Sequence, residues 1–327
     1  MVVKALVTGI KGFVGSHLTE LLLEKGYEVA GLCTAGNIVE KPSRAYWTLP
    51  KEVKLFEADL RDGEQISKII ISFSPDVIFH LAAQSSVKLS FENPIDTFSV
   101  NIIGSLNILE SISGMKPPPK TLMVASSEIY GLLKPEDMPV TEDFPLAPVN
   151  PYGVSKATVD MLGYQYYKSY QLPVYLARAF SHSGPRQRTA AVLSDWSFQT
   201  AKIELGLSTP EIKVGNLDVT RDYTDVRDVV KAYLAIIERG KPGKPYNICS
   251  GNGYRIKDLL EIITSFSSKK IKVVSDPSRL RPVDIPILIG SPEKIQTDVG
   301  WKPDININKT LRDLYIYWID YLTPQIE

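Results

Sequence analysis

Three side chains near the middle of the chain could together move a proton. Tyr152 and Lys156 are four residues apart, so they would share one face of a helix, and Ser126 ends an apolar run upstream. A tyrosine phenol has a pKa near ~10, and an ammonium group one helical turn away favours its ionised form. The spacing predicts a proton-exchanging tyrosine, an activating lysine and a serine that orients the substrate oxygen. Because Tyr-x-x-x-Lys also arises by chance on amphipathic helices, this interpretation depends on the surrounding elements.

A glycine-rich turn near the start of the chain predicts the kind of cofactor that would act together with this tyrosine. Residues 2–8 form a short apolar run, and residues 13–25 have helical periodicity. Between them, Gly9 permits a tight turn, Gly12 lets the backbone approach a pyrophosphate, and Gly15 allows the helix to pack closely on the strand. A dinucleotide bound there, beside a proton-exchanging tyrosine, indicates an oxidoreductase that transfers a hydride.

Apolar runs alternate with helical patterns along the following sequence. Strands are expected at 28–33, 53–56, 76–82, 121–126, 174–180 and 246–249, and helices at 63–73, 95–113, 152–170 and 226–239. This alternation predicts an α/β fold with a Rossmann-type, doubly wound parallel sheet covered on both faces. Ligands bind outside the carboxyl ends of such strands. The glycine turn, residues 80–84 and residues 126–128 all fall there.

The composition of the sequence changes near residue 181, where Pro and Gly begin to interrupt short segments. A chain of 327 residues is also long for a single core. We therefore expect a Rossmann domain over residues 1–180, to which residues 222–249 return. A smaller C-terminal α/β substrate-binding lobe is expected over residues 181–327, interleaved with the first domain.

The composition excludes several other classes of protein. Lys and Arg together number 37, as do Asp and Glu, so there is no basic footprint for nucleic acid. Cys33 and Cys249 are expected to be buried thiols, and the three histidines have no metal-ligand spacing. No apolar stretch approaches the ~20 residues of a membrane span. Since the glycine motif begins at Thr8, no signal peptide is expected, and the chain is expected to be cytoplasmic.

Five motifs together resemble the extended short-chain dehydrogenase/reductases, which act on nucleotide-sugars. They are the glycine turn over 8–15, Asp59-Leu60-x-Asp62, His80-Leu81-Ala82-Ala83, Ser126-Ser127-x-x-Tyr130-Gly131 and Tyr152-x-x-x-Lys156. The resemblance covers nearly the whole chain. It implies that Tyr152 is the catalytic acid–base, that Lys156 activates it and binds the cofactor ribose, and that Ser126 completes the set.

The resemblance also implies the residues that line the cofactor site, with Asp59 at the adenine. They are Gly9, Lys11, Gly12, Phe13, Val14, Gly15, Thr34, Asp59, Leu60, Leu81, Ala82 and Ala83, together with Tyr152 and Lys156. An NAD site needs a carboxylate at the end of the second strand, whereas this chain has Thr34 there and no acid before Glu40. Lys11 occupies a place where a basic residue can meet a 2′-phosphate. We therefore expect NADP(H) rather than NAD(H).

Three stretches of the second lobe, over 213–228, 246–251 and 281–291, resemble the members that act on GDP-sugars. In these members two arginines clamp the diphosphate and an acid reaches the ribose. The substrate residues expected on this basis are Ser85, Ser127, Ser181, Lys202, Arg221, Arg281 and Asp284. One departure is that Phe-Asn-His of the family is Phe180-Ser181-His182 here, so that a hydroxyl replaces an amide at the sugar.

The resemblance is greatest to enzymes that reduce the 4-keto group of a GDP-6-deoxy-4-ketohexose with NADPH. Such an enzyme converts GDP-4-keto-6-deoxy-D-mannose to GDP-D-rhamnose. GDP-mannose 4,6-dehydratase is the alternative, because Glu128 beside the catalytic set could serve as its acid or base. An alternative from another class is a dinucleotide-sensing protein without catalysis, although a sensor has no chemical need for all three polar residues.

The helices expected over 95–113 and 152–170 carry more apolar residues than one sheet-facing stripe requires. The surplus comprises Ile102, Ile103, Leu106, Ile108 and Leu109 on the first helix, and Val159, Met161, Leu162, Tyr166 and Tyr167 on the second. A helix that is apolar over more than about 100° of its circumference usually has a second partner. In the family these helices form a four-helix bundle across a two-fold axis, so a homodimer is expected. Burial under the second lobe is the alternative.

Overall fold

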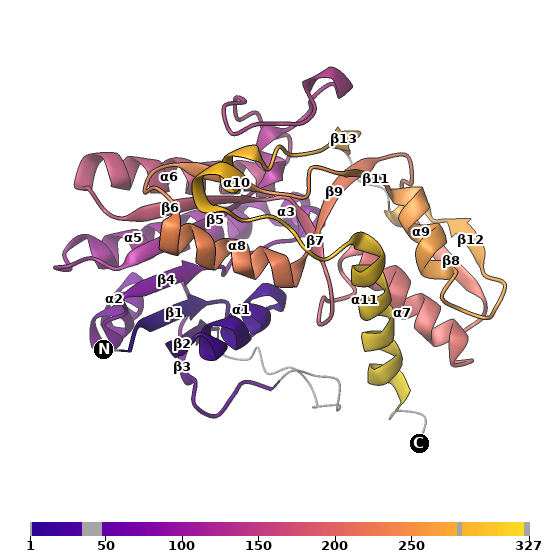
Figure 1. Cartoon of the computed structure of the whole chain (residues 1–327), viewed down its shortest axis with the longest axis horizontal. Coiled ribbons are helices and arrows are strands. Elements are labelled where there is room, and N and C mark those ends of the chain that lie inside the picture. Colours follow the sequence, from indigo (N-terminus) through magenta and orange to yellow (C-terminus); the bar gives the residue numbers. More distant parts are fainter. Residues whose placement is uncertain (1, 35–47, 280–282, 324–327) are drawn as a thin grey trace.

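The computed structural model describes residues 2–34, 48–279 and 283–323 of the chain. Its main layer is a seven-stranded sheet with the strand order β10-β6-β5-β4-β1-β2-β3 (Figure 1). All neighbouring strands in it are parallel. The strands are β1 (Lys4–Thr8), β2 (Glu28–Cys33), β3 (Lys54–Glu57), β4 (Val77–His80), β5 (Lys120–Ser126), β6 (Val174–Ala179) and β10 (Pro245–Ile248). The order reverses at β1, between β2 and β4, and open α/β sheets bind ligands outside the carboxyl ends at such a point.

Helices cover both faces of this sheet, as expected for apolar parallel strands. On one face lie α1 (Phe13–Glu24), α8 (Val226–Arg239) and α10 (Glu293–Val299), and on the other α2 (Gly63–Phe73), α5 (Gly104–Ser113) and α6 (Pro151–Tyr170). Leu22 and Ile236 belong to the buried cluster of the first face, and Ile70 and Leu109 to that of the second. The sheet and its two helical layers are therefore of the Rossmann type.

The helix expected over 95–113 is interrupted. The chain runs through α3 (Val87–Glu92) and α4 (Pro94–Phe98) into a π-helical turn, Ser99–Ile103, and then into α5. A π-turn adds a residue to the helix and is frequent at functional sites. The helix expected over 95–113 is therefore present as α4, the π-turn and α5, although the apolar periodicity from which it was predicted does not reveal the π-turn.

The remaining elements form a smaller lobe beside the carboxyl ends of the main strands (Figure 1). One sheet contains β7 (Ser181–Ser183), β9 (Thr220–Asp225), β11 (Gly253–Arg255) and β13 (Ile287–Leu288), and a two-stranded sheet contains β8 (Glu211–Val214) and β12 (Lys272–Ser275). The helices α7 (Val192–Glu204), α9 (Ile256–Thr264) and α11 (Ile307–Leu322) pack together around Trp196, Leu260 and Trp318. Short 3₁₀ turns cover Ser127–Tyr130, Pro135–Asp137 and Pro277–Arg279.

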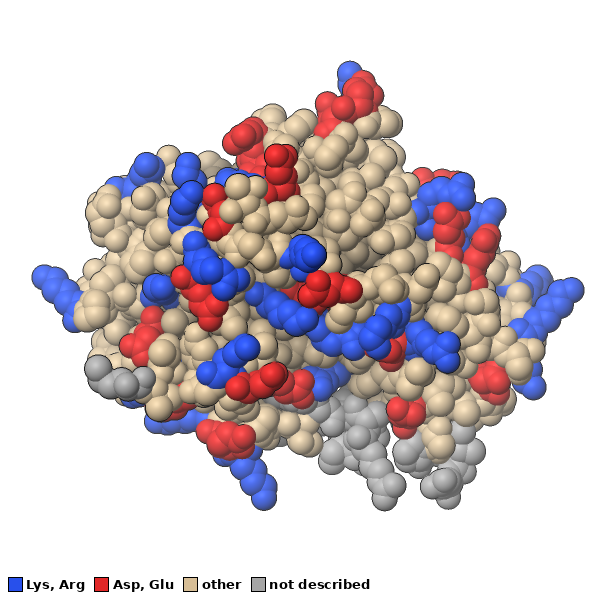
Figure 2. Space-filling model, in the orientation of Figure 1, with Lys and Arg blue, Asp and Glu red and all other residues tan. Residues whose placement is uncertain are grey.

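The surface carries charges of both signs. Lys and Arg side chains lie among Asp and Glu side chains over the face drawn in Figure 2. Among the residues that the structure describes, no helix is long and apolar enough to cross a membrane, and no group of three His, Cys, Asp or Glu could hold a metal ion. Cys33 and Cys249 are buried free thiols.

Candidate active site

The glycine turn joins β1 to α1 directly. Gly9 has a φ of +71°, in the left-handed region that favours glycine, and a side chain on Gly15 would lie 2.3 Å from the Gly9 carbonyl oxygen. No side chain caps the N-terminus of α1 at Gly12, and its first turn contains no acidic residue. The backbone N–H groups and the positive end of the helix are therefore free to bind phosphate, and the turn fits a dinucleotide pyrophosphate.

His80, at the end of β4, links the glycine strand to the helix behind the site. The Thr8 hydroxyl oxygen accepts from the amides of Leu81 and Ala82, both at 3.1 Å, so its proton is directed to His80 Nδ1 at 2.9 Å. His80 Nε2 then donates to Ser105 Oγ at 3.0 Å. Burial, with a smaller effect of the Lys156 charge, lowers the pKa of His80 to about 3, so the ring is neutral. His80 is a positioning residue that fixes the backbone after β4.

The π-turn brings Asn101 into the same network. Its side-chain amide donates to the Gln84 carbonyl at 3.0 Å and to Ser155 Oγ at 2.8 Å, while Asn101 Oδ1 accepts from the Gln84 amide at 2.7 Å. Ser155 Oγ in turn donates to the Tyr152 carbonyl at 2.7 Å. The segment after β4 and the first turn of α6 are thus joined through one buried asparagine.

Tyr152 lies in the first turn of α6, beside the end of β5. Burial raises the pKa of its phenol to about 12, opposed by a hydrogen bond with Ser126 and reinforced by the Glu128 carboxylate. In the free protein, desolvation has the largest effect on the pKa of Tyr152. At neutral pH the phenol keeps its proton, which suits a proton donor.

Lys156 is buried one turn further along α6. Its ammonium donates to the Val124 carbonyl of β5 at 2.7 Å. Burial lowers the pKa of Lys156 to about 8, so its charge is present at neutral pH and is lost in mildly alkaline solution. The contact with Val124 fixes the lysine relative to the strand that ends in Ser126.

Glu128 is held toward the catalytic helix by a residue that the sequence did not single out. Asn150 caps α6 by accepting from the Gly153 amide at 2.7 Å, and its Nδ2 donates to Glu128 Oε2 at 2.8 Å. The Ser126 hydroxyl also accepts from the Glu128 amide, at 3.3 Å. One helix cap therefore sets the position of the carboxylate next to Tyr152.

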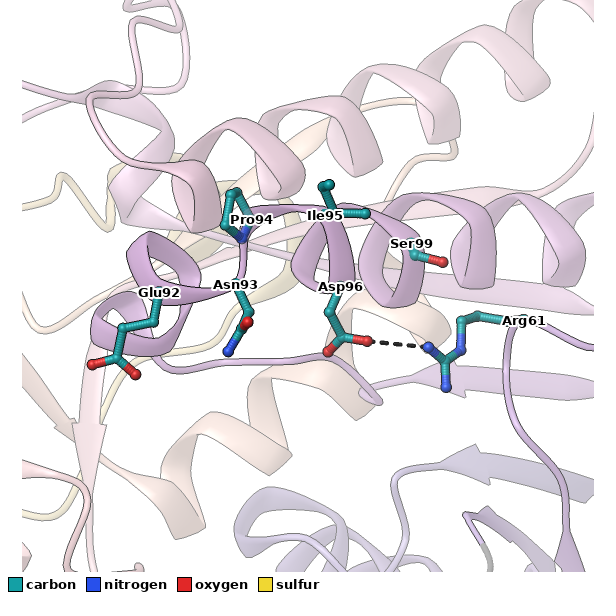
Figure 3. A pocket seen from close by; sticks show the side chains of 7 residues that line it. All are labelled: Arg61, Glu92, Asn93, Pro94, Ile95, Asp96 and Ser99. Carbon is teal, nitrogen blue, oxygen red and sulfur yellow. Dashed lines mark hydrogen bonds and ion pairs between the residues drawn. The ribbon is translucent and has the colours of Figure 1, made fainter.

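The Asp59 carboxylate, which is expected at the adenine, already forms an ion pair with Arg61. Arg61 donates to it from Nε at 2.9 and 3.1 Å, and from Nη2 at 2.5 Å, and this pairing is the main cause that lowers the pKa of Asp59. Arg61 also reaches Asp96 at 3.1 Å, across a shallow hollow that Ile95 borders (Figure 3). The Asp59 carboxylate is thus oriented by Arg61 beside the end of β3.

The residues expected to determine the preference for NADP over NAD lie at the end of β2 and in the glycine turn. Thr34 is exposed directly after Cys33, and Lys11 is partly exposed in the glycine turn. Glu40 and Arg281 lie outside the described residues.

In the second lobe the structure brings together two of the expected substrate residues. Arg221 of β9 and Asp284 form an ion pair at 3.3 Å, and Asn216 donates to Asp284 at 3.1 Å. Lys202, in the last turn of α7, lies with its ammonium 5.6 Å from the centre of the Phe198 ring.

The remaining expected residues lie on both sides of the junction between the lobes. Ser127 is buried after β5, Ser85 is exposed after β4, and Ser181 begins β7. His182 of β7 stacks on Phe13 of α1, with ring centres 6.0 Å apart and an interplanar angle of 13°. The second lobe thus contacts the helix that follows the glycine turn.

A parallel sheet with a phosphate-binding glycine turn, and with Ser126, Tyr152 and Lys156 at its carboxyl edge, defines a short-chain dehydrogenase/reductase of the extended type. A family model described as GDP-mannose 4,6 dehydratase matches residues 6–314. The chain belongs to that family and is an enzyme of it.

Relatives and solved structures agree with this assignment. The GDP-6-deoxy-D-mannose reductase of Pseudomonas aeruginosa is 31% identical over 318 residues, which cover 97% of this chain and 98% of the relative. A GDP-mannose 4,6-dehydratase of Vibrio cholerae is 29% identical over 346 residues, covering 95% and 92%. RMD from Pseudomonas aeruginosa, solved with NADPH, has a TM-score of 0.81 at 30% identity and covers 97% of this chain and 98% of that one. The UDP-glucose 4-epimerase of Thermus thermophilus, solved with NAD, has a TM-score of 0.85 at 31% identity, covering 96% and 98%.

Proposed function

We propose that this enzyme reduces the 4-keto group of a GDP-6-deoxy-4-ketohexose with NADPH. The observation that carries the proposal is the similarity over 97% of the chain to a GDP-6-deoxy-D-mannose reductase. Tyr152, which holds its proton at neutral pH, could donate that proton to the ketone oxygen, as reduction requires.

The glycine turn, the uncapped start of α1 and the segment Leu81–Ala83 after β4 would hold the cofactor. When bound, NADPH supplies the hydride for the ketone carbon. Tyr152 would give its proton to the C4 oxygen, Ser126 would orient that oxygen by a hydrogen bond, and the Lys156 ammonium would stabilise the phenolate left behind.

The substrate would bind between the lobes. Arg221 and Arg281 would bind the diphosphate, since the guanidinium fork matches phosphate oxygens. Asp284 would then contact the ribose hydroxyls. Its ion pair with Arg221 would hold the Asp284 carboxylate in position for this contact. Ser85, Ser127, Ser181 and Lys202 remain proposed contacts to the sugar and nucleotide.

GDP-mannose 4,6-dehydratase activity is the second candidate, and Glu128 is the observation that favours it. Its carboxylate is fixed by Asn150 at 2.8 Å, next to Tyr152, which would take the C4 hydroxyl proton while bound NADP⁺ would accept the C4 hydride. A dehydratase needs such a group at C5 and C6, and relatives with that activity match 95% of this chain.

One assay separates the candidates. Purified protein is mixed with GDP-4-keto-6-deoxy-D-mannose and NADPH, and separately with GDP-mannose and NADP⁺. We expect NADPH to be oxidised only with the keto sugar. Loss of the 6-hydroxyl from GDP-mannose without net NADPH oxidation would assign the dehydratase instead. Binding of NADPH without turnover of either sugar would indicate a non-catalytic sensor.

The cofactor preference can be tested at Lys11. Replacing Lys11 with Ala should raise the Kd for NADPH about tenfold and leave that for NADH nearly unchanged, because only NADPH carries the 2′-phosphate that an ammonium would pair with. Fluorescence titration with both cofactors measures this, with Lys25→Ala, at the far end of α1, as the matched control. Equal weakening of both cofactors would show that Lys11 does not face the 2′-phosphate.

The rate should depend on pH through Lys156. Its ammonium is present below a pKa of about 8 and is lost above it, so kcat/KM for reduction should be level below that pH and fall as pH rises through it. In Lys156→Arg the guanidinium stays charged, so the fall near pH 8 should disappear even if the rate is lower. An identical alkaline fall in both proteins would assign it to another group.

We also propose a homodimer formed by α4, α5 and α6, with a correction to its contact residues. Ile108, Leu109, Val159 and Tyr166 are buried within the chain and are not surplus. Instead Ile95 is 84% exposed and Met161 63% exposed, and Leu89, Ile103 and Val154 are exposed as well. Apolar side chains exposed on neighbouring helices favour a self-complementary interface.

Sedimentation equilibrium at micromolar concentration tests this interface. The wild-type protein should have twice the chain mass of 36.4 kDa, and Met161→Glu should shift it toward the monomer because a charge would be buried at the interface. Ile316→Glu, a change at an exposed isoleucine of α11, should leave the dimer intact. A monomeric wild-type protein would refute the proposal.

A further inference from the structure

A second cavity lies away from the active site, between α6 and the edge strand β10. It has a volume of about 580 Å³, which falls within the range of small-molecule sites. Its lining comes from the middle of α6, from β6, from the turn before β10 and from the start of α10. Neither the catalytic set nor the glycine turn contributes to it.

Aromatic rings form one wall of this cavity. A side chain on Gly243, which has a φ of +72°, would lie 2.0 Å from Tyr167, so this ring packs closely against the turn before β10. Tyr164, one turn earlier on α6, is partly open to solvent. The Lys168 ammonium lies 5.6 Å from the centre of the Tyr164 ring and 5.5 Å from that of Tyr167. A flat ring could stack on this wall beside a positive charge.

A second part of the lining is cationic. Lys244 and Lys294 line it, and no acidic group lies within ion-pair distance of either among the residues that the structure describes. Burial, and the charges of Lys244 and Arg178, lower the pKa of Lys294, although Glu142 and Asp143 partly oppose this. Of the other charges in the lining, Asp160 is paired with Arg178 at 2.8 Å. The lining therefore carries more unpaired positive charge, on Lys168, Lys244 and Lys294, than negative charge, on Asp143.

We propose that this cavity binds a nucleoside phosphate, with its base on Tyr164 and its phosphate between Lys244 and Lys294. A phosphate would relieve the repulsion between the two lysines and accept hydrogen bonds from both. Stacking on an aromatic ring accepts any base, so the geometry assigns the class of ligand rather than one nucleotide.

The test is calorimetric titration of AMP into protein already saturated with NADPH, which occupies the cofactor site. We expect AMP to bind, and the double variant Lys244→Ala/Lys294→Ala to weaken its Kd about tenfold or more while keeping the wild-type affinity for NADPH. Lys257→Ala, at an exposed lysine of α9 outside the cavity, is the control and should bind AMP like the wild type.

A further variant tests the base-binding wall. Tyr164→Ala should weaken AMP but leave inorganic phosphate unaffected, because phosphate has no ring to stack. Absence of AMP binding at millimolar concentration, or equal AMP affinity of the double variant and the wild type, would overturn the proposal. An unchanged AMP affinity in Tyr164→Ala would overturn the assignment to a nucleoside. NADPH affinity and turnover of the keto sugar are measured separately, so failure here is distinct from failure of the proposed reductase.

Discussion

Replacing Tyr152 with Phe should lower kcat for reduction of the keto sugar by ~10² or more. The substitution removes the phenolic proton donor and its hydrogen bond with Ser126, and it keeps the ring that packs in the first turn of α6. The affinity for NADPH should change little, because the expected phosphate contacts come from the glycine turn. Steady-state kinetics, together with fluorescence titration of NADPH, measures both effects.

Tyr170→Phe is the matched control, since it removes a hydroxyl from an exposed tyrosine of the same helix. It should keep full activity. If Tyr152→Phe instead retained near wild-type kcat, the proton would come from another group, and the assignment of Tyr152 to catalysis would be wrong. A large loss of NADPH affinity in that variant would indicate a role in cofactor binding.

Much of the Rossmann sheet could be predicted because its signals are local. The run over 28–33 and the helices over 63–73 and 226–239 coincide with β2, α2 and α8. Continuous burial on both sides makes a parallel strand apolar throughout, so its ends are clear in the sequence. The short strands of the second lobe, such as β7 and β13, have no such signal, because pairing between distant segments determines them.

The candidate site was only partly predictable, for a similar reason. Tyr152 and Lys156 share one helix, so their spacing carries information. The sequence positions of Asn101 and Asn150 carry no such information. Their roles depend on contacts with Ser155 and Glu128, which lie 54 and 22 residues away in the chain. A Pro directly after Asn150 does signal a helix start, and the cap could have been found from it. No comparable local pattern marks the π-turn around Asn101.

Breaking the buried Arg178–Asp160 ion pair behind α6 should destabilise the protein more than breaking any other ion pair in the described part of the chain. Asp160 lies one turn beyond Lys156 on the same face of α6, and Arg178 of β6 donates to both of its oxygens, at 3.1 and 2.8 Å. Arg178 also donates to Tyr130 Oη at 3.1 Å and to the Glu142 carbonyl at 2.8 Å. Both charged side chains are almost fully buried.

Replacing Arg178 with Met should therefore lower the free energy of unfolding by about 3–5 kcal/mol, because Asp160 would be left as an uncompensated buried charge. Urea denaturation followed by circular dichroism measures the loss. The double variant Arg178→Met/Asp160→Leu should be more stable than Arg178→Met, since the unpaired charge is then removed as well. As a control, Lys68→Met breaks an exposed pair with Glu64 and should leave the unfolding midpoint unchanged. A double variant no more stable than Arg178→Met would show that the unpaired Asp160 carboxylate is not the cause of the destabilisation.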